Sequence, residues 1–261
     1  MELGLRGRTA FVTGASRGIG AAIAEALAAE GVNLGLFSRR PERCDALVDR
    51  LRDAGIRVVV MALDFEKPEM IPNAVAEAIT TLGSLDILVN NAGGATRGHL
   101  EEITDEAWDK CFAVKPIGVM RMARETIPHL EKSDQARIIN IAGTRGREPS
   151  MFSVMAGPIN FGTLSATKVL ANALGPKGVT VNAINPGSTD TRRWQELRRM
   201  TAAERDLSEE EAEQYLLREV PLGRVVRPED VADLAVFLAS ARAGMISGCA
   251  VNVDGGRTRS I

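Results

Sequence analysis

Thr9-Ala-Phe-Val-Thr-Gly-Ala-Ser-Arg-Gly-Ile-Gly20 is the stretch of sequence that decides the fold. An apolar strand leads through a glycine-rich turn into an alanine-rich helix, which is the context of a dinucleotide-binding turn. Gly14 permits the tight turn, Gly18 lets the backbone approach a pyrophosphate, and Gly20 allows close packing of helix and strand. The N–H groups at the start of the helix attract the phosphates. We predict that the cofactor is bound by Gly14, Ser16, Arg17, Gly18, Ile19 and Gly20.

The pattern of this first unit repeats along the chain. Short apolar runs alternate with amphipathic stretches, which indicates repeated βα units and a parallel sheet covered by helices. The expected strands are Thr9–Val12, Val32–Phe37, Arg57–Ala62, Leu85–Asn90, Arg137–Ile141, Val179–Ile184 and Ala250–Val253. The expected helices are Gly18–Ala29, Pro41–Ala54, Pro68–Leu82, Thr104–Leu130, Gly162–Leu174 and Pro228–Leu238. The sequence therefore predicts an α/β fold, with residues 1–261 forming a single Rossmann-type domain of three layers.

One charged segment departs from this rhythm. Residues 191–219 are rich in charge and have a helical period, so their simplest interpretation is a solvated helical excursion. Ligands of open parallel sheets bind beyond the carboxyl ends of the strands, where such a segment can close over them. We therefore predict a helical lid over residues 188–220.

The composition excludes several kinds of partner. A formal net charge of -2 gives no field that would attract nucleic acid. The sequence contains no run of about 18 apolar residues that would predict a membrane span, and no basic and apolar leader precedes the first strand. Three cysteines without a C-x-x-C spacing and only two histidines offer little to a metal, so no metal site is predicted. We expect a cytoplasmic protein with a small-molecule substrate.

The end of the second expected strand favours one dinucleotide over the other. NAD sites usually place an acidic residue there, against the ribose 2′-hydroxyl. This chain has Ser38 and Arg39 instead, with Arg17 in the first turn. A hydroxyl and guanidinium groups bind a 2′-phosphate through charge-assisted hydrogen bonds, whereas a carboxylate would repel it. The sequence therefore predicts NADP(H) as the cofactor in preference to NAD(H), with Ser38 and Arg39 in its site.

Five motifs in order resemble the short-chain dehydrogenase/reductase family. They are the TGxxxGxG turn at residues 13–20, an acid at Asp64, NNAG at residues 90–93, NPG at residues 185–187 and DGG at residues 254–256. The resemblance implies a seven-stranded Rossmann sheet, oxidoreductase activity, and assembly as a homotetramer or homodimer. It also implies cofactor contacts from Asp64, Phe65, Asn91, Ala92, Gly93, Pro186, Gly187 and Thr189.

The family's Asn-Ser-Tyr-Lys catalytic tetrad is matched at one position. Lys168 stands where the resemblance places the lysine, whose role is to lower the pKa of the tyrosine and to hold the nicotinamide ribose. The tyrosine position, four residues earlier, is Leu164. The serine position is Gly143 and the asparagine position is Lys115. Three of the four catalytic side chains are therefore expected to be absent.

Neighbouring residues do not restore the missing acid. The chain's one tyrosine, Tyr215, falls in the predicted lid, and the spacing of the family's enoyl reductases would place their acid at Phe161. The stretch between Gly143 and Leu164 is also longer than the family pattern with this alignment, which indicates a rebuilt substrate loop. The polar residues that could face the nicotinamide instead are Thr144, Glu148, Ser153, Asn160 and Ser165.

Lys115 and Lys168 remain as candidate catalytic groups. If both ammonium groups lie in one partly desolvated cleft, their repulsion lowers the pKa of one of them, which then acts as a general acid or base near neutral pH. The simpler alternative is that Lys115 pairs with a carboxylate or a ligand phosphate and takes no part in chemistry.

Three functions are consistent with these residues. The first is an atypical NADP(H)-dependent oxidoreductase that works without the tyrosine, since the cofactor supplies most of the chemistry. The second is a catalytically silent NADP(H)-binding homologue. The third is a lyase, isomerase or cyclase that keeps the cofactor for structural reasons.

Overall fold

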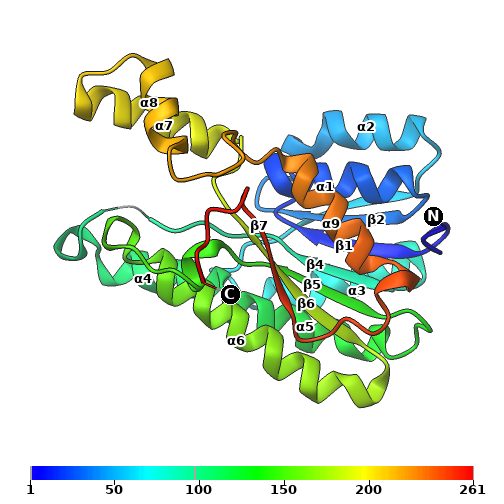
Figure 1. The fold of residues 1–261 in the computed structure, drawn as a ribbon. Helices are drawn as coiled ribbons and strands as arrows, with labels where there is room; N and C mark the ends of the chain where they lie inside the picture. The colour runs from blue at the N-terminus through cyan, green and yellow to red at the C-terminus, as the bar shows by residue number, and fades with distance from the viewer. Residues whose placement is uncertain (1, 97, 261) are drawn as a thin grey trace.

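A computed structural model describes residues 2–96 and 98–260 as one parallel sheet between two layers of helices (Figure 1). The strand order is β3-β2-β1-β4-β5-β6-β7, and each neighbouring pair is parallel. The strands are β1 (Thr9–Thr13), β2 (Asn33–Ser38), β3 (Val58–Ala62), β4 (Ile87–Asn90), β5 (Arg137–Ile141), β6 (Thr180–Pro186) and β7 (Ala250–Val253). The predicted fold class, a seven-stranded Rossmann-type sheet, is confirmed.

The strand order places the topological switch point of the sheet at the predicted turn. β1 lies between β2 and β4, with Ala10 opposite both Leu34 and Ile87. The chain therefore moves outward from β1 in one direction, through β2 and β3, and then returns to the other side of β1 with β4. In parallel sheets such a reversal opens a ligand crevice at the carboxyl ends of the strands. The turn after β1 and the loops after β4, β5 and β6 all begin at this edge.

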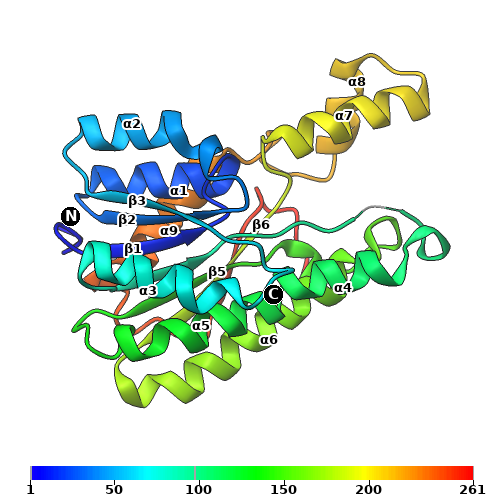
Figure 2. The ribbon, with the colours of Figure 1, turned by 180° about the vertical axis from the view of Figure 1, so that it is seen from behind.

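Helices cover both faces of the sheet, as Figures 1 and 2 show from opposite sides. One face carries α1 (Gly18–Ala29), α2 (Asp45–Asp53) and α9 (Pro228–Ala239), and the other carries α3 (Met70–Leu82), α5 (Ile117–Leu130) and α6 (Ala156–Leu174). Short 3-10 helices lie at Pro41–Cys44, Leu100–Glu102, Thr144–Gly146, Met151–Ser153, Gly175–Lys177 and Ala241–Ala243. Among the helices of the described residues, none is both long enough and apolar enough to span a membrane.

The helix predicted over Thr104–Leu130 is two helices. α4 (Asp105–Val114) ends before Lys115, and α5 starts after Pro116. Lys115 is extended, with φ −140° and ψ 137°. A proline disfavours the helical conformation in the residue before it, which explains the break. Because Lys115 leaves the helix, its side chain is directed by the break rather than by helical periodicity.

α6 begins earlier than the sequence predicts. The expected start was Gly162, but the helix starts at Ala156, so the enlarged loop expected between Gly143 and Leu164 is wrong. Gly157 and Pro158 lie in the first turn of α6. The first turn of a helix tolerates such residues, since its N–H groups have no partner within the helix.

α7 (Arg192–Arg205) and α8 (Glu209–Leu217) project from the sheet and pack on each other (Figure 1). Arg198 of α7 donates to Glu209 at 2.8 Å and to Glu213 at 2.9 Å, both on α8. The helical excursion has the position that the sequence predicts. Its role as a lid remains a prediction.

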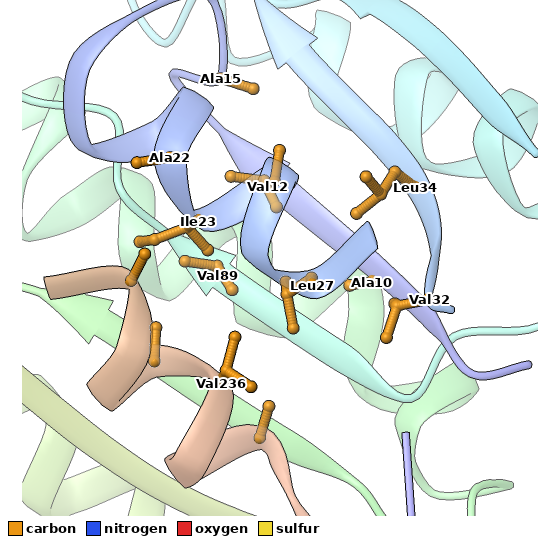
Figure 3. Close-up of a cluster of buried hydrophobic side chains, with 14 of the residues drawn as sticks. Ala10, Val12, Ala15, Ala22, Ile23, Leu27, Val32, Leu34, Val89 and Val236 are labelled. Atoms are coloured by element: carbon orange, nitrogen blue, oxygen red, sulfur yellow. The ribbon is translucent and has the colours of Figure 1, made fainter. Parts of the chain in front are cut away.

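Small side chains let α1 and α9 pack closely on one face of the sheet. Figure 3 shows Ile23 of α1, Val89 of β4 and Val236 of α9 pointing toward one another. Ile23 and Val89 are completely buried. Six alanines of α1 are interspersed with Ile23 and Leu27, so the helix approaches its neighbours without large side chains in between. This contact holds the start of α1, and with it the glycine-rich turn, against the sheet.

We expect Ile23→Ala to lower the free energy of unfolding by about 2–5 kcal/mol, the usual cost of truncating a fully buried isoleucine. Met245→Ala is the matched control, because that side chain is 98% exposed and its truncation leaves no cavity. Urea unfolding followed by circular dichroism measures both. Equal midpoints for the two variants would contradict the packing described.

Candidate functional site

The glycine-rich turn is held against the loop that follows β4. A Cβ on Gly20 would lie 2.4 Å from both the Nδ2 of Asn91 and the carbonyl oxygen of Gly14. Gly14 itself has φ +66°, and a Cβ there would lie 2.9 Å from the Cα of Ala92. Only glycine fits at either position, since the neighbouring atoms are mostly backbone. The predicted cofactor residues Gly14, Gly20, Asn91 and Ala92 thus lie together.

Hydrogen bonds hold the glycine-rich turn against the loop after β4. Asn91 donates its side-chain amide to the carbonyl oxygens of Thr13 at 3.0 Å and Gly14 at 3.1 Å. The backbone N–H groups of Asn91 and Ala92 donate to the Thr13 hydroxyl, each at 3.0 Å. Asn91 therefore braces the turn. Ser16, Arg17, Gly18 and Ile19 remain at least partly accessible at the start of α1, where helix N–H groups can bind phosphate.

The end of β2 presents the predicted serine and arginine differently. Ser38 is buried, and its hydroxyl donates to the carbonyl oxygen of Arg40 at 3.1 Å. Arg39 is exposed, with its Nη1 3.8 Å from Glu66, a weak surface pair. Arg39 is therefore available to a ligand, whereas the Ser38 hydroxyl is engaged in shaping the turn.

The charges of three other arginines act on Arg17, and we call the four residues the arginine cluster: Arg17, Arg39, Arg43 and Arg192. Partial burial lowers the pKa of Arg17, and the positive charges of Arg192, Arg43 and Arg39 lower it further, against a small opposing effect of Glu196. Sequence reasoning missed Arg43 and Arg192. Arg192 comes from the first turn of α7 and is brought here only by the fold. The cluster favours an anionic ligand.

Two predicted residues after β3 have different surroundings. Asp64 is half-buried and accepts the backbone N–H of Glu66 at 3.1 Å. The ring of Phe65 lies in the core, where a Cβ on Gly118 would meet it at 2.7 Å. The Phe65 side chain is therefore a packing residue, and only its backbone can face a cofactor.

The loop after β6 forms another part of the carboxyl edge of the sheet. Pro186 ends the strand, and Gly187 packs so closely on Asp254 that a Cβ would lie 2.8 Å from the aspartate Cβ. Thr189 is buried and donates its hydroxyl to the carbonyl oxygen of Gly187 at 3.1 Å. These three predicted residues thus share one tight loop at the carboxyl edge.

Lys115 lies between the ends of β4 and β5. Its ammonium group donates to the carbonyl oxygen of Ile141 and, at 3.2 Å, to that of Ala142. Its side chain crosses Gly93, where a Cβ would lie 2.4 Å from the lysine Cε. Lys115 is buried, and burial together with the positive charge of Arg193 lowers its pKa to about 8. The pKa has the predicted direction, but the second cation is Arg193.

The predicted position of Lys168 is wrong. A Cβ on Gly248 would lie 2.9 Å from the Lys168 Nζ, and the Gly248 N–H donates to the carbonyl of Val181 near the start of β6. Val181 precedes the last residue of β6, Pro186, by five residues. At about 3.3 Å per residue, Val181 lies roughly 16 Å from the carboxyl end of the strand. Lys168 therefore lies near the opposite edge of the sheet and forms no pair with Lys115.

The residue of α6 that faces the end of β5 is Asn160. A Cβ on Gly143, the predicted serine position, would lie 3.0 Å from the Asn160 Nδ2. Asn160 precedes Lys168 by eight residues, slightly more than two helical turns. The turn before Asn160 begins with the buried Ala156. The part of α6 that faces the end of β5 therefore contains Ala156 and Asn160, and not Leu164 and Lys168 as predicted, because the helix starts earlier than expected.

The other candidate polar groups are mostly committed elsewhere. Thr144 is buried at the start of a 3-10 helix, Ser153 is half-buried and Ser165 is exposed. Glu148 accepts the backbone N–H of Ser260 at 2.7 Å and that of Arg259. The Tyr215 ring lies between the guanidinium groups of Arg205 and Arg218, each 4.0 Å from its centroid. Among these groups, Asn160 is the one that contacts the serine position.

A glycine-rich turn at the topological switch point of a parallel sheet defines a dinucleotide-binding protein of the Rossmann class. The chain matches the family model described as enoyl-(acyl carrier protein) reductase over residues 14–258. It belongs to the short-chain dehydrogenase/reductase family.

Named relatives cover nearly the full length of the chain. The short-chain reductase protein NovJ of Streptomyces niveus is 37% identical over 253 residues, which span 95% of this chain and 93% of NovJ. The 3-oxoacyl-(acyl-carrier-protein) reductase FabG of Aquifex aeolicus is 33% identical, covering 98% and 99%. L-Sorbose reductase from Gluconobacter frateurii, solved with NADPH and L-sorbose, superposes with a TM-score of 0.95 at 30% identity, with both chains fully covered.

The lowered pKa of Lys115 links folding to pH. Between its folded value of about 8 and the unfolded value of 10.5, the unfolded chain binds more protons. The free energy of unfolding of the wild type should therefore rise with pH across this window, relative to Lys115→Met, by up to about 3 kcal/mol. Urea unfolding from pH 7 to pH 10.5 measures it. Parallel curves for the two proteins would show that Lys115 titrates normally.

Proposed function

We propose that the protein is an NADP(H)-dependent oxidoreductase that reduces a carbonyl group of a small-molecule substrate and uses Lys115 as its proton donor. The observation that supports this proposal most directly is the ammonium group of Lys115, buried at the carboxyl edge beside Gly93 with a pKa of about 8. The ketoacyl and sugar reductases among the relatives support carbonyl chemistry.

The residues fit NADP(H) in two respects. The turn from Gly14 to Gly20 leaves a cradle that side chains would fill, beside the N–H groups that begin α1. The arginine cluster supplies positive charge beyond what Glu66 and Glu196 balance, which suits a 2′-phosphate. The NADPH bound to the sorbose reductase supports the same assignment. The cofactor would be held by the turn, by Asn91 through the turn, and by Arg17 and Arg39.

The reduced nicotinamide supplies a hydride when it is bound. The chain then has to supply a proton to the oxygen that the hydride makes anionic. Lys115 has three N–H groups, of which two donate to the Ile141 and Ala142 carbonyls and one remains for a substrate. A pKa of about 8 keeps it protonated at neutral pH and makes the proton easier to transfer than from an ordinary lysine. Solvent reprotonates the amine.

Lys115 thus takes a catalytic role that the family gives to a tyrosine, which makes the active site atypical. In α6, Asn160 faces Gly143 and Ala156 lies one turn before it, and neither side chain carries a hydroxyl group. A second candidate function is an NADP(H)-binding protein without turnover. The two carbonyl contacts of Lys115 favour it, because they also suit a purely structural ammonium group.

Assembly as a homodimer or homotetramer remains part of the proposal. Large apolar side chains on the outer helices support it, namely Ile117 and Met120 of α5 and Phe161 and Val169 of α6, which are 40–65% exposed. Apolar patches of this kind often mark protein interfaces.

We expect Gly20→Ala to abolish NADPH binding, because its Cβ would collide with Asn91 and with the backbone of Gly14. Gly175→Ala is the matched control, since a Cβ there meets nothing within 4 Å and its φ is −52°. NADPH fluorescence titration measures the dissociation constants, and circular dichroism checks the fold. Wild-type affinity in a folded Gly20→Ala variant would argue against the turn as the binding site.

Deuteride transfer tests the reaction. With stereospecifically deuterated NADPH and a panel of ketones, enones and imines, we expect transfer to ketones by the wild type. Lys115→Met should reduce it at least about 100-fold, the usual range for a general acid, without changing NADPH affinity. The wild-type rate should fall above about pH 8, as the ammonium group loses its proton.

Lys168→Ala provides the control, because that lysine lies near the opposite edge of the sheet. Transfer that survives in Lys115→Met would remove the lysine from the mechanism. Transfer to none of the substrates, with NADPH still bound, would favour the silent homologue.

A further inference from the structure

Arg193 extends from the predicted lid across the candidate active site. It is the second residue of α7, and its Nη2 donates to the carbonyl oxygen of Ala95 at 2.7 Å. Its Nη1 lies 3.4 Å from the place where a Cβ on Gly94 would stand. The guanidinium group is thus held on the loop after β4, and the residue as a whole remains exposed to solvent.

The side chain of Lys115 packs against Gly93, the residue that precedes Gly94 in the loop after β4. A Cβ on Gly93 would stand 3.1 Å from the Lys115 Nζ, next to the Gly94 position that Arg193 covers. The positive charge of Arg193 contributes to the lowered pKa of Lys115, in addition to burial. Two cations from separate elements therefore flank residues 93–95, one buried and one accessible.

Neither cation has a carboxylate partner in the described part of the chain. No carboxylate oxygen of those residues lies within 4.0 Å of either group. The acidic side chains whose charge reaches Arg193 are Cys111 and Glu196, and Glu196 is paired with Arg192 at 3.1 Å. By contrast, Arg198 on the same helix has two carboxylate partners. Placing two like charges together without a counter-ion is unfavourable, and a bound anion relieves it.

We propose that Arg193 binds a carboxylate of the substrate, which makes short oxo carboxylates the substrate class. This inference rests on the proposed reduction, with Lys115 at the carbonyl oxygen and Arg193 at the carboxylate. A guanidinium group has five N–H donors in a planar fork that matches a carboxylate, and the Ala95 carbonyl uses one of them. Because the two cations lie against the consecutive residues Gly93 and Gly94, the proposal is for an acid whose carbonyl lies one or two carbons from its carboxylate.

The kinetic test compares 2-oxobutanoate and 3-oxobutanoate with their methyl esters, which keep the carbonyl but lose the charge. We expect the wild type to prefer the acids by about tenfold or more in kcat/KM. Arg193→Gln should lose this preference, mainly through a higher KM for the acids, so that acids and esters become about equal in kcat/KM. Arg199→Gln, an exposed arginine on the same helix, is the control.

A binding test separates this inference from the reaction itself. Calorimetric titration of the protein–NADP+ complex with butanoate, and with the neutral butanamide, needs no turnover. We expect butanoate to bind the wild type and Arg199→Gln, and to lose affinity about tenfold in Arg193→Gln. Such binding without reduction of any acid or ester would remove the proposed reaction but keep the anion site.

Two results would overturn the inference. One is reduction of the esters as fast as the acids by the wild type, which leaves the proposed function standing. The other is a loss of NADPH affinity in Arg193→Gln equal to its loss of acid affinity, which would assign the arginine to a cofactor phosphate.

Discussion

The contact between the glycine-rich turn and the loop after β4 is the constraint on which the candidate site depends. Asn91 bridges the carbonyls of Thr13 and Gly14, and the space for this bridge exists because Gly20 has no side chain. The contact joins two strands that are neighbours in the sheet but far apart in the sequence. It fixes the start of α1 relative to residues 91–95, and so places a phosphate-binding helix end beside the loop that supports both cations.

The second organising feature is the break at Pro116. It turns Lys115 out of the helix and toward the carbonyls of β5, while Pro116 packs so closely on α6 that a Cβ on Gly162 would lie 2.8 Å from its ring. An ammonium group in such a buried place loses hydration, and two carbonyl contacts compensate only in part. The lowered pKa of Lys115 is the result, and it makes a lysine suitable for proton transfer near neutral pH.

Charge is distributed in two groups along the edge of the sheet. The arginine cluster lies at the end of β2, and Lys115 with Arg193 lies beyond β4. The adjacent residues Arg192 and Arg193 of α7 contribute one member to each group. The helical excursion therefore carries charge to both halves of the crevice. Anions bound in either half would attract it toward the sheet.

The sequence by itself determined the fold class, the glycine-rich turn and the basic end of β2, because apolar periodicity and turn chemistry are properties of residues close together in the chain. It did not determine the register of α6. Lys168 was assigned to the site from a local motif, yet the packing of Pro116 on Gly162 and of Asn160 on Gly143 turns a different part of the helix toward the edge. Arg43, Arg192 and Arg193 also have no local signal that would place them at the candidate site. Only the tertiary structure decided their places, because contacts between distant segments fix where each helix begins and which of its side chains reach the carboxyl ends of the strands.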